Sequence, residues 1–98
     1  MSAQYEGICS KIADKIKKIN DIIPDDFACW HVRIRQILEK IESANENFYS
    51  SDIRKEIQLE VNSVFSLRAL GDIYWPDMPP TQEWWRRLSE VCKISNLL

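Results

Sequence analysis

The chain has 98 residues, of which 45% are hydrophobic and 29% are charged, and its net charge at pH 7 is −2. This length is that of one domain, 1–98, and this composition excludes a disordered chain. An acidic balance gives no overall positive field for nucleic acid or an anionic membrane, and the 2 glycines leave little material for a phosphate-binding loop. We therefore expect partners to be proteins or small molecules rather than nucleic acids or membranes.

The three cysteines, Cys9, Cys29 and Cys92, are far apart in the sequence and form no Cys-x-x-Cys pair for zinc or redox exchange. The N-terminal residues contain no long apolar run, so we expect neither a signal peptide nor a membrane span. An odd number of cysteines without a leader is typical of reduced thiols, so we expect a cytoplasmic protein.

The first expected helix covers residues 3–22. Its apolar residues recur at steps of three and four and give the helix one hydrophobic face: Tyr5, Ile8, Ile12, Ile16, Ile19 and Ile23. Pro24 should end this segment, because proline disfavours helical geometry at the residue before it.

The second expected helix covers residues 26–44 and starts with Asp25 or Asp26 as its N-cap. Its apolar residues again follow helical spacing: Phe27, Trp30, Ile34, Ile37 and Ile41. The pattern fades after residue 43, and we expect Phe48 and Tyr49 to fix the next loop onto the helices.

The third expected helix covers residues 52–70 and opens at Ser50, Ser51 or Asp52, all of which are good caps. Gly71 should terminate it in a left-handed conformation, which costs glycine little. A connection rich in proline and aromatic residues follows. Thr81 is then expected to cap the fourth helix, residues 81–95.

These segments predict an all-α fold: a small four-helix bundle with up-down topology, or an orthogonal helical array as the alternative. The long connection before the last helix leaves the direction of that helix open.

The sequence predicts no catalytic residue, no metal ligand and no cofactor. Position 28 is Ala, so the only histidine, His31, lacks the Glu-x-x-His spacing of di-iron bundles. A structural or solvated role is expected for it. Asp25 and Asp26 are more typical of a helix cap than of acid–base catalysis.

The most unusual stretch is 75–87, which combines prolines with residues that often dominate protein interfaces. We predict a partner-binding site here, made by Trp75, Trp84, Trp85, Arg86 and Arg87. Adjacent tryptophans on a helix point about 100° apart. One of Trp84 and Trp85 should therefore pack inward, while the other lies under the loop or at the surface.

A second cluster is basic. Lys11, Lys15 and Lys18 share one helical face and could join Arg86 and Arg87 in a patch for an acidic partner or RNA. The negative total charge favours an ordinary solvated face.

From Trp30 onward the chain resembles a family of small bacterial helical domains of unknown function. In that family a helix opens with Trp, and a second helix ends in a small-residue motif followed by Asp. The matching residues here are Trp30, Leu38 and the run Ser66-Leu67-Arg68-Ala69-Leu70-Gly71-Asp72-Ile73. The resemblance covers about half of the chain and implies no site residue. In size and class the chain is also similar to immunity proteins, which block a partner toxin.

The leading hypothesis is a non-enzymatic module that binds another protein, with an inhibitor or immunity-type role as one version. Burial of a tryptophan anchor in a partner pocket would supply the binding energy. The alternatives are a homodimeric assembly module and, with less support, a small RNA-binding helical protein.

Overall fold

The computed structural model describes residues 2–98, with side chains from residue 4 onward. It contains four α-helices: α1 (Ser2–Ile22), α2 (Ala28–Ser43), α3 (Ser51–Val64) and α4 (Thr81–Ser95). Two short 3₁₀ helices, η1 (Asp25–Phe27) and η2 (Leu70–Asp72), precede α2 and follow α3. Residues 2–98 include no strand, so the predicted all-α class is confirmed.

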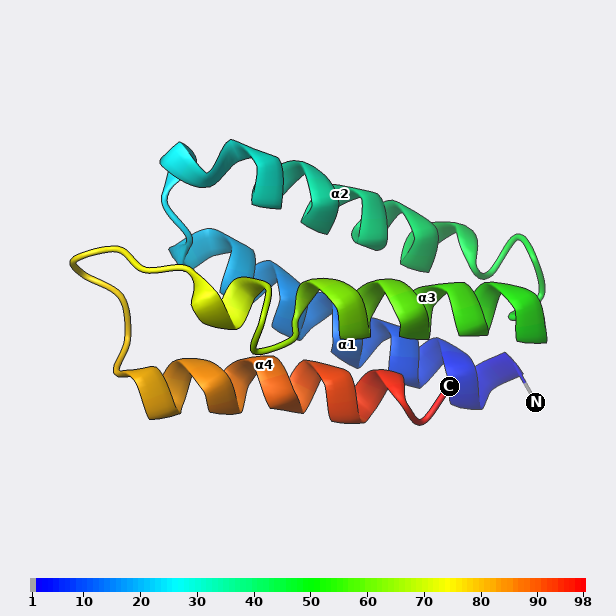
Figure 1. The fold of residues 1–98 in the computed structure, drawn as a ribbon. Helices are drawn as coiled ribbons and strands as arrows, with labels where there is room; N and C mark the ends of the chain where they lie inside the picture. The colour runs from blue at the N-terminus through cyan, green and yellow to red at the C-terminus, as the bar shows by residue number, and fades with distance from the viewer. Residues whose placement is uncertain (1) are drawn as a thin grey trace.

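The helices form an up-down bundle, in which each one runs opposite to the next (Figure 1). Around the bundle, α1 packs against α2 and α4, and α3 packs against the same two helices. This arrangement measures 44 × 23 × 19 Å. The bundle form of the prediction is therefore the observed one, and α4 runs antiparallel to α3.

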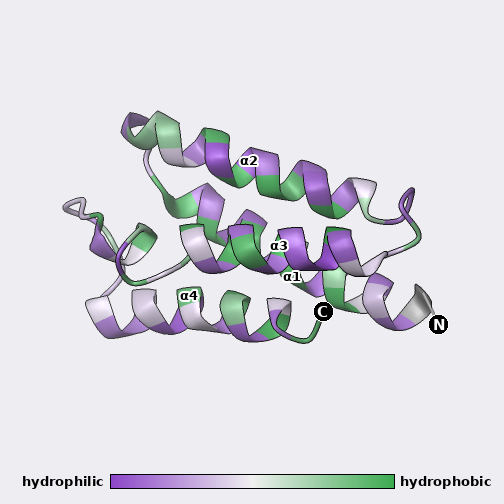
Figure 2. Cartoon of the chain, turned by 45° about the vertical axis from the view of Figure 1, so that its right-hand side comes forward, coloured by the Kyte–Doolittle hydropathy of each residue, from purple (hydrophilic) through white to green (hydrophobic). Residues whose placement is uncertain are grey.

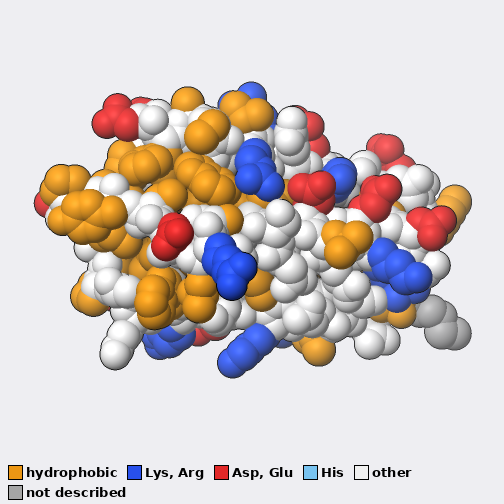
Figure 3. Space-filling view, viewed as in Figure 1, with side chains coloured by type: hydrophobic (Ala, Val, Ile, Leu, Met, Phe, Trp, Pro, Cys, Tyr) orange, Lys and Arg blue, Asp and Glu red, His pale blue; other side chains and the backbone are white. Residues whose placement is uncertain are grey.

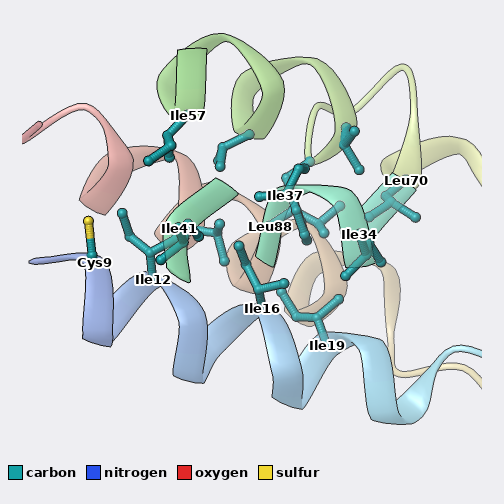
Figure 4. Packing of buried hydrophobic residues seen from close by; sticks show 14 of the residues in the cluster. Cys9, Ile12, Ile16, Ile19, Ile34, Ile37, Ile41, Ile57, Leu70 and Leu88 are labelled. Carbon is teal, nitrogen blue, oxygen red and sulfur yellow. The ribbon is translucent and has the colours of Figure 1, made fainter. Parts of the chain in front are cut away.

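The core consists of the apolar faces that the spacing predicted. Ile12, Ile16 and Ile19 of α1 face Ile34, Ile37 and Ile41 of α2 (Figure 4). Ile57, Val61 and Val64 of α3, with Leu88 and Val91 of α4, complete the buried set. Hydrophobic bands on the helices alternate with hydrophilic ones that face solvent (Figure 2). Removing these side chains from water is the main driving force for the fold.

Two of the expected N-caps are wrong. Neither Asp25 nor Asp26 caps α2, because the chain first forms η1, where the Phe27 N–H donates to the Pro24 carbonyl oxygen at 3.1 Å. Thr81 is the first residue of α4 rather than its cap, and Pro80 stands at the cap position. The Ser50 cap of α3 is confirmed, since its hydroxyl oxygen accepts from the Ile53 N–H at 3.4 Å.

The predicted end of the third helix at residue 70 is also wrong, because α3 ends at Val64. The chain then turns back on itself: the N–H groups of Ala69 and Gly71 both donate to the Ser66 carbonyl oxygen. Gly71 lies in η2 and does not adopt a positive φ, contrary to expectation. Glycine suits this position because an added Cβ would lie 3.2 Å from the Ser66 oxygen.

The two aromatic residues in the loop between α2 and α3 differ in burial. Phe48 and Tyr49 have φ values of 55° and 51°. Tyr49 is buried, as expected, whereas the Phe48 side chain is 88% exposed and does not hold the loop. Arg54 fixes this end of the bundle instead, donating to the Tyr49 and Leu98 backbone oxygens at 2.9 and 2.6 Å.

Of the helices within residues 2–98, none combines the length and the apolar character needed to cross a membrane.

Candidate partner-binding surface

Trp84 is the largest fully buried side chain among the described residues. Its indole N–H donates to the Leu70 carbonyl oxygen at 2.9 Å. The Trp75 ring packs edge-on against it at 5.3 Å between centroids and is 7% exposed. Phe27 lies 6.0 Å from Trp75 on the other side. Two of the predicted site residues therefore belong to the core, where they are not free to enter a partner's pocket.

Trp85 lies at the surface, with 40% of the residue exposed. Its indole N–H donates to the Gly71 carbonyl oxygen at 3.1 Å, one residue beyond the carbonyl that Trp84 uses. This bond satisfies the polar atom of the ring within the chain, so the part left to solvent is mainly hydrocarbon. It also fixes the ring in one orientation. The sequence-based expectation that the two tryptophans diverge is confirmed.

Two other large apolar side chains are exposed in the same part of the chain. Leu67 is 47% exposed and lies against Gly71, while Tyr74 in the following loop is 73% exposed. Hydrophobic side chains gather at this end of the molecule, over the 65–80 segment and the neighbouring helix ends (Figure 3). We call Leu67, Tyr74 and Trp85 the Trp85 surface.

Leu67 and Tyr74 were absent from the predicted site. The spacing of Leu67 fits a continuing helix stripe, and only the early end of α3 exposes it. Tyr74 follows Ile73 in the loop, and the sequence contains no signal that separates the exposed residue from its half-buried neighbour.

Arg86 and Arg87 lie apart from this surface. Both line a hollow between α1 and α4, together with Lys15, Lys18, Ile19 and Glu90. Arg87 donates to the Glu83 carboxylate at 3.0 Å. The five predicted site residues thus occupy three environments: the core, the Trp85 surface and a basic hollow.

His31 connects two segments of the bundle. One ring nitrogen, Nδ1, lies 2.6 Å from the Asn20 side-chain oxygen near the end of α1. The other, Nε2, donates to the carbonyl oxygens of Ile23 and Pro24 at 3.0 and 3.1 Å. With both nitrogens engaged by the protein, the geometry supports the structural role expected for this histidine.

The cysteines show no nucleophilic arrangement. Burial raises the pKa of the Cys9 and Cys92 thiols above the usual value, which favours their unreactive protonated form. Cys29 is exposed. Within residues 2–98, His, Cys, Asp and Glu side chains form no group of three or more that could hold a metal ion.

The chain matches no model of a known protein family, and no curated protein or solved structure is significantly similar to it. The likeness to small bacterial helical domains therefore stays a hypothesis.

Proposed function

We propose that the protein is a non-enzymatic module that binds another protein through the Trp85 surface. The observation that carries this proposal is the position of Trp85: a large aromatic ring, half-exposed, is held rigidly by its bond to the Gly71 carbonyl. Tryptophan anchors of this kind lose little conformational freedom on binding and rank among the strongest contributors to protein interfaces.

The surroundings of Trp85 support a protein as the ligand. Leu67 and Tyr74, both in the 65–80 segment, add exposed apolar area. An inhibitor or immunity-type role would be one version of this function.

The proposal is tested by quantitative capture of partners from lysate of the source organism. Trp85→Ala and Leu67→Ser should each remove the same captured protein, while circular dichroism shows that both variants keep the helical fold at the temperature of the experiment. Leu59→Ser is the matched control, because Leu59 is 72% exposed on α3 and lies outside the Trp85 surface.

Capture that is unchanged by Trp85→Ala and Leu67→Ser, or equally reduced by Leu59→Ser, would contradict the proposal. Light scattering over a range of concentrations tests the alternative function, a homodimeric assembly module. A dimer that dissociates when Trp85 is replaced would show that the ligand of this surface is a second copy of the chain.

A further inference from the structure

A groove runs between α1 and α4, separate from the Trp85 surface. It consists of two hollows of about 260 and 590 Å³, which share Lys15 and Lys18 in their walls. Because both hollows follow the contact between the same two helices, they form one furrow from the N-terminal part of α1 to the first turns of α4. We call it the α1–α4 groove.

The walls of this groove are basic in an acidic protein. Five cations line it, against two carboxylates: Lys11, Lys15, Lys18, Arg86 and Arg87 against Asp14 and Glu90. Helices α1 and α4 carry seven of the thirteen Lys and Arg residues of the chain but only five of the fifteen Asp and Glu residues. Positive charge is thus concentrated here although the net charge is −2.

Part of this charge is already neutralised within the chain. Lys15 pairs with Glu90 at 3.2 Å, and Arg87 pairs with Glu83 at 3.0 Å. Lys11, Lys18 and Arg86 make no ion pair with any residue whose side chain the structure describes. Three cations are therefore available to an anionic ligand without breaking an internal bond.

The groove also has apolar lining. Ile19 lies in the smaller hollow, and Ile8, Ile94 and Leu97 lie in the larger one. Leu97 is 64% exposed, so this end offers hydrocarbon surface to a ligand. A basic wall combined with an apolar lining matches a ligand that is both acidic and amphipathic.

Gly7 supplies an independent observation. It lies inside α1 and lines the larger hollow, where a Cβ would have no described atom within 4 Å apart from its chain neighbours and the backbone of its own helix. It does not adopt a positive φ, so neither packing nor backbone conformation requires glycine. Glycine destabilises a helix interior relative to alanine. Close approach of a ligand to the α1 backbone accounts for a glycine at this point.

From this geometry we infer that the α1–α4 groove binds an acidic amphipathic helix of a partner protein. The groove residues on α1 extend from Gln4 to Lys18, which at 1.5 Å per residue is about 21 Å, or four turns of a docked helix. The apolar face of that helix would lie on Ile8, Ile94 and Leu97, with its carboxylates toward Lys11, Lys18 and Arg86.

Single-stranded RNA fits the groove less well than an acidic helix. None of the lining residues is aromatic, so no base can stack on a ring. The inference does not depend on the Trp85 surface, because no residue of that surface lines the groove.

The test is a selection of helical 16-residue peptides from an unbiased displayed library on the unmodified protein, followed by fluorescence anisotropy of the best peptide. The enriched peptides should carry net negative charge and apolar residues at steps of three and four. Their affinity should fall about tenfold in the double variant Lys18→Glu, Arg86→Glu. Lys17→Glu is the matched control, since Lys17 is exposed on α1 outside the groove.

The variant Gly7→Leu should change the thermal stability and the peptide affinity in opposite directions. Leucine favours the helix, so the thermal midpoint should rise by roughly 4 °C, while peptide affinity falls about tenfold because the side chain fills the groove.

Several results would overturn the inference. These are neutral or basic peptides after selection, equal losses of affinity in Lys17→Glu and in the groove variant, or unchanged binding in Gly7→Leu. Tighter binding of a labelled 15-nucleotide RNA than of the selected peptide would make the ligand a nucleic acid. A dimer by light scattering that the groove variant dissociates would make it a second copy of the chain.

Discussion

Two regions of this bundle are stabilised by different contacts. One is the isoleucine core, and the other is the tryptophan-rich corner, formed by α4 and the 65–71 segment. In the core, side chains such as Ile16 and Ile37 are fully buried and belong to one cluster of hydrophobic residues. In the corner, side chains of α4 donate to backbone carbonyls of the 65–71 segment: Trp84 to Leu70, Trp85 to Gly71 and Cys92 to Phe65. The core is stabilised mainly by burial of apolar side chains. The corner also depends on directional hydrogen bonds, and one of these holds Trp85 at the surface.

The largest expected effect comes from Trp84. We expect Trp84→Ala to lower the free energy of unfolding by about 3–5 kcal/mol, because it opens a large cavity and removes the indole N–H that donates to the Leu70 carbonyl oxygen. Ile37→Val, which removes one methylene from the core, should cost about 1 kcal/mol. Urea unfolding followed by circular dichroism measures both. Equal losses in the two variants would mean that the corner contributes no more than ordinary core packing.

The next effect concerns His31, whose hydrogen bonds connect α2 to the end of α1 beside the isoleucine core. Removal of the ring in His31→Ala takes away the donor to the Ile23 and Pro24 carbonyls and should cost about 2 kcal/mol. Arg35→Ala is the control, as an exposed residue of the same helix. A loss in His31→Ala no larger than that of the control would show that the bonds of His31 contribute nothing net.

Gly71→Ala should have a smaller effect, about 1 kcal/mol of destabilisation. The new Cβ would lie 3.2 Å from the Ser66 oxygen, which cannot easily move because it accepts two N–H bonds. Gly7→Ala, where the Cβ meets open space, should instead stabilise the chain. Thermal unfolding of the two alanine variants shows whether each one is more or less stable than the unmodified chain. Stabilisation by both substitutions would show that close packing at Gly71 does not require glycine.

The smallest effect is a pH dependence that arises from two thiols, the buried Cys9 and the partly buried Cys92. Burial raises the pKa of Cys9 and Cys92 above 9.0, so the folded chain holds these protons at a pH where the unfolded chain releases them. The free energy of unfolding should therefore fall as pH rises above about 9. The double variant Cys9→Ala, Cys92→Ala should show a shallower fall than the unmodified chain, whereas identical slopes would contradict this prediction.

The sequence predicts the core well because helical periodicity is a local property. The stripes of α1 and α2 follow spacings of three and four residues, and the structure buries the isoleucines that those spacings select from Ile12 to Ile23 and from Ile34 to Ile41. The residues at the start of each stripe, such as Tyr5 and Trp30, are partly buried. The Ser50 cap is equally local, since its bond to Ile53 spans three residues.

The corner is less predictable because its determinants are distant in sequence. The apolar spacing through Phe65 and Leu67 continues to look helical, yet α3 ends at Val64. Partners 14 and 27 residues away occupy the carbonyls of Leu70, Gly71 and Phe65, and no local pattern contains this information. Divergence of Trp84 and Trp85 follows from helix geometry, but which one is buried depends on those contacts.

The central claim is that Trp85 contacts a partner while its neighbour Trp84 supports the fold. The most direct measurement is ¹H–¹⁵N NMR of the indole N–H signals, assigned with Trp85→Phe, during titration with the protein captured in the lysate experiment. The account predicts that the Trp85 indole signal and the Leu67 amide signal shift, while the Trp75 and Trp84 indole signals stay in place. Shifts confined to the α3 residues around Leu59, with the Trp85 signal unchanged, would contradict it.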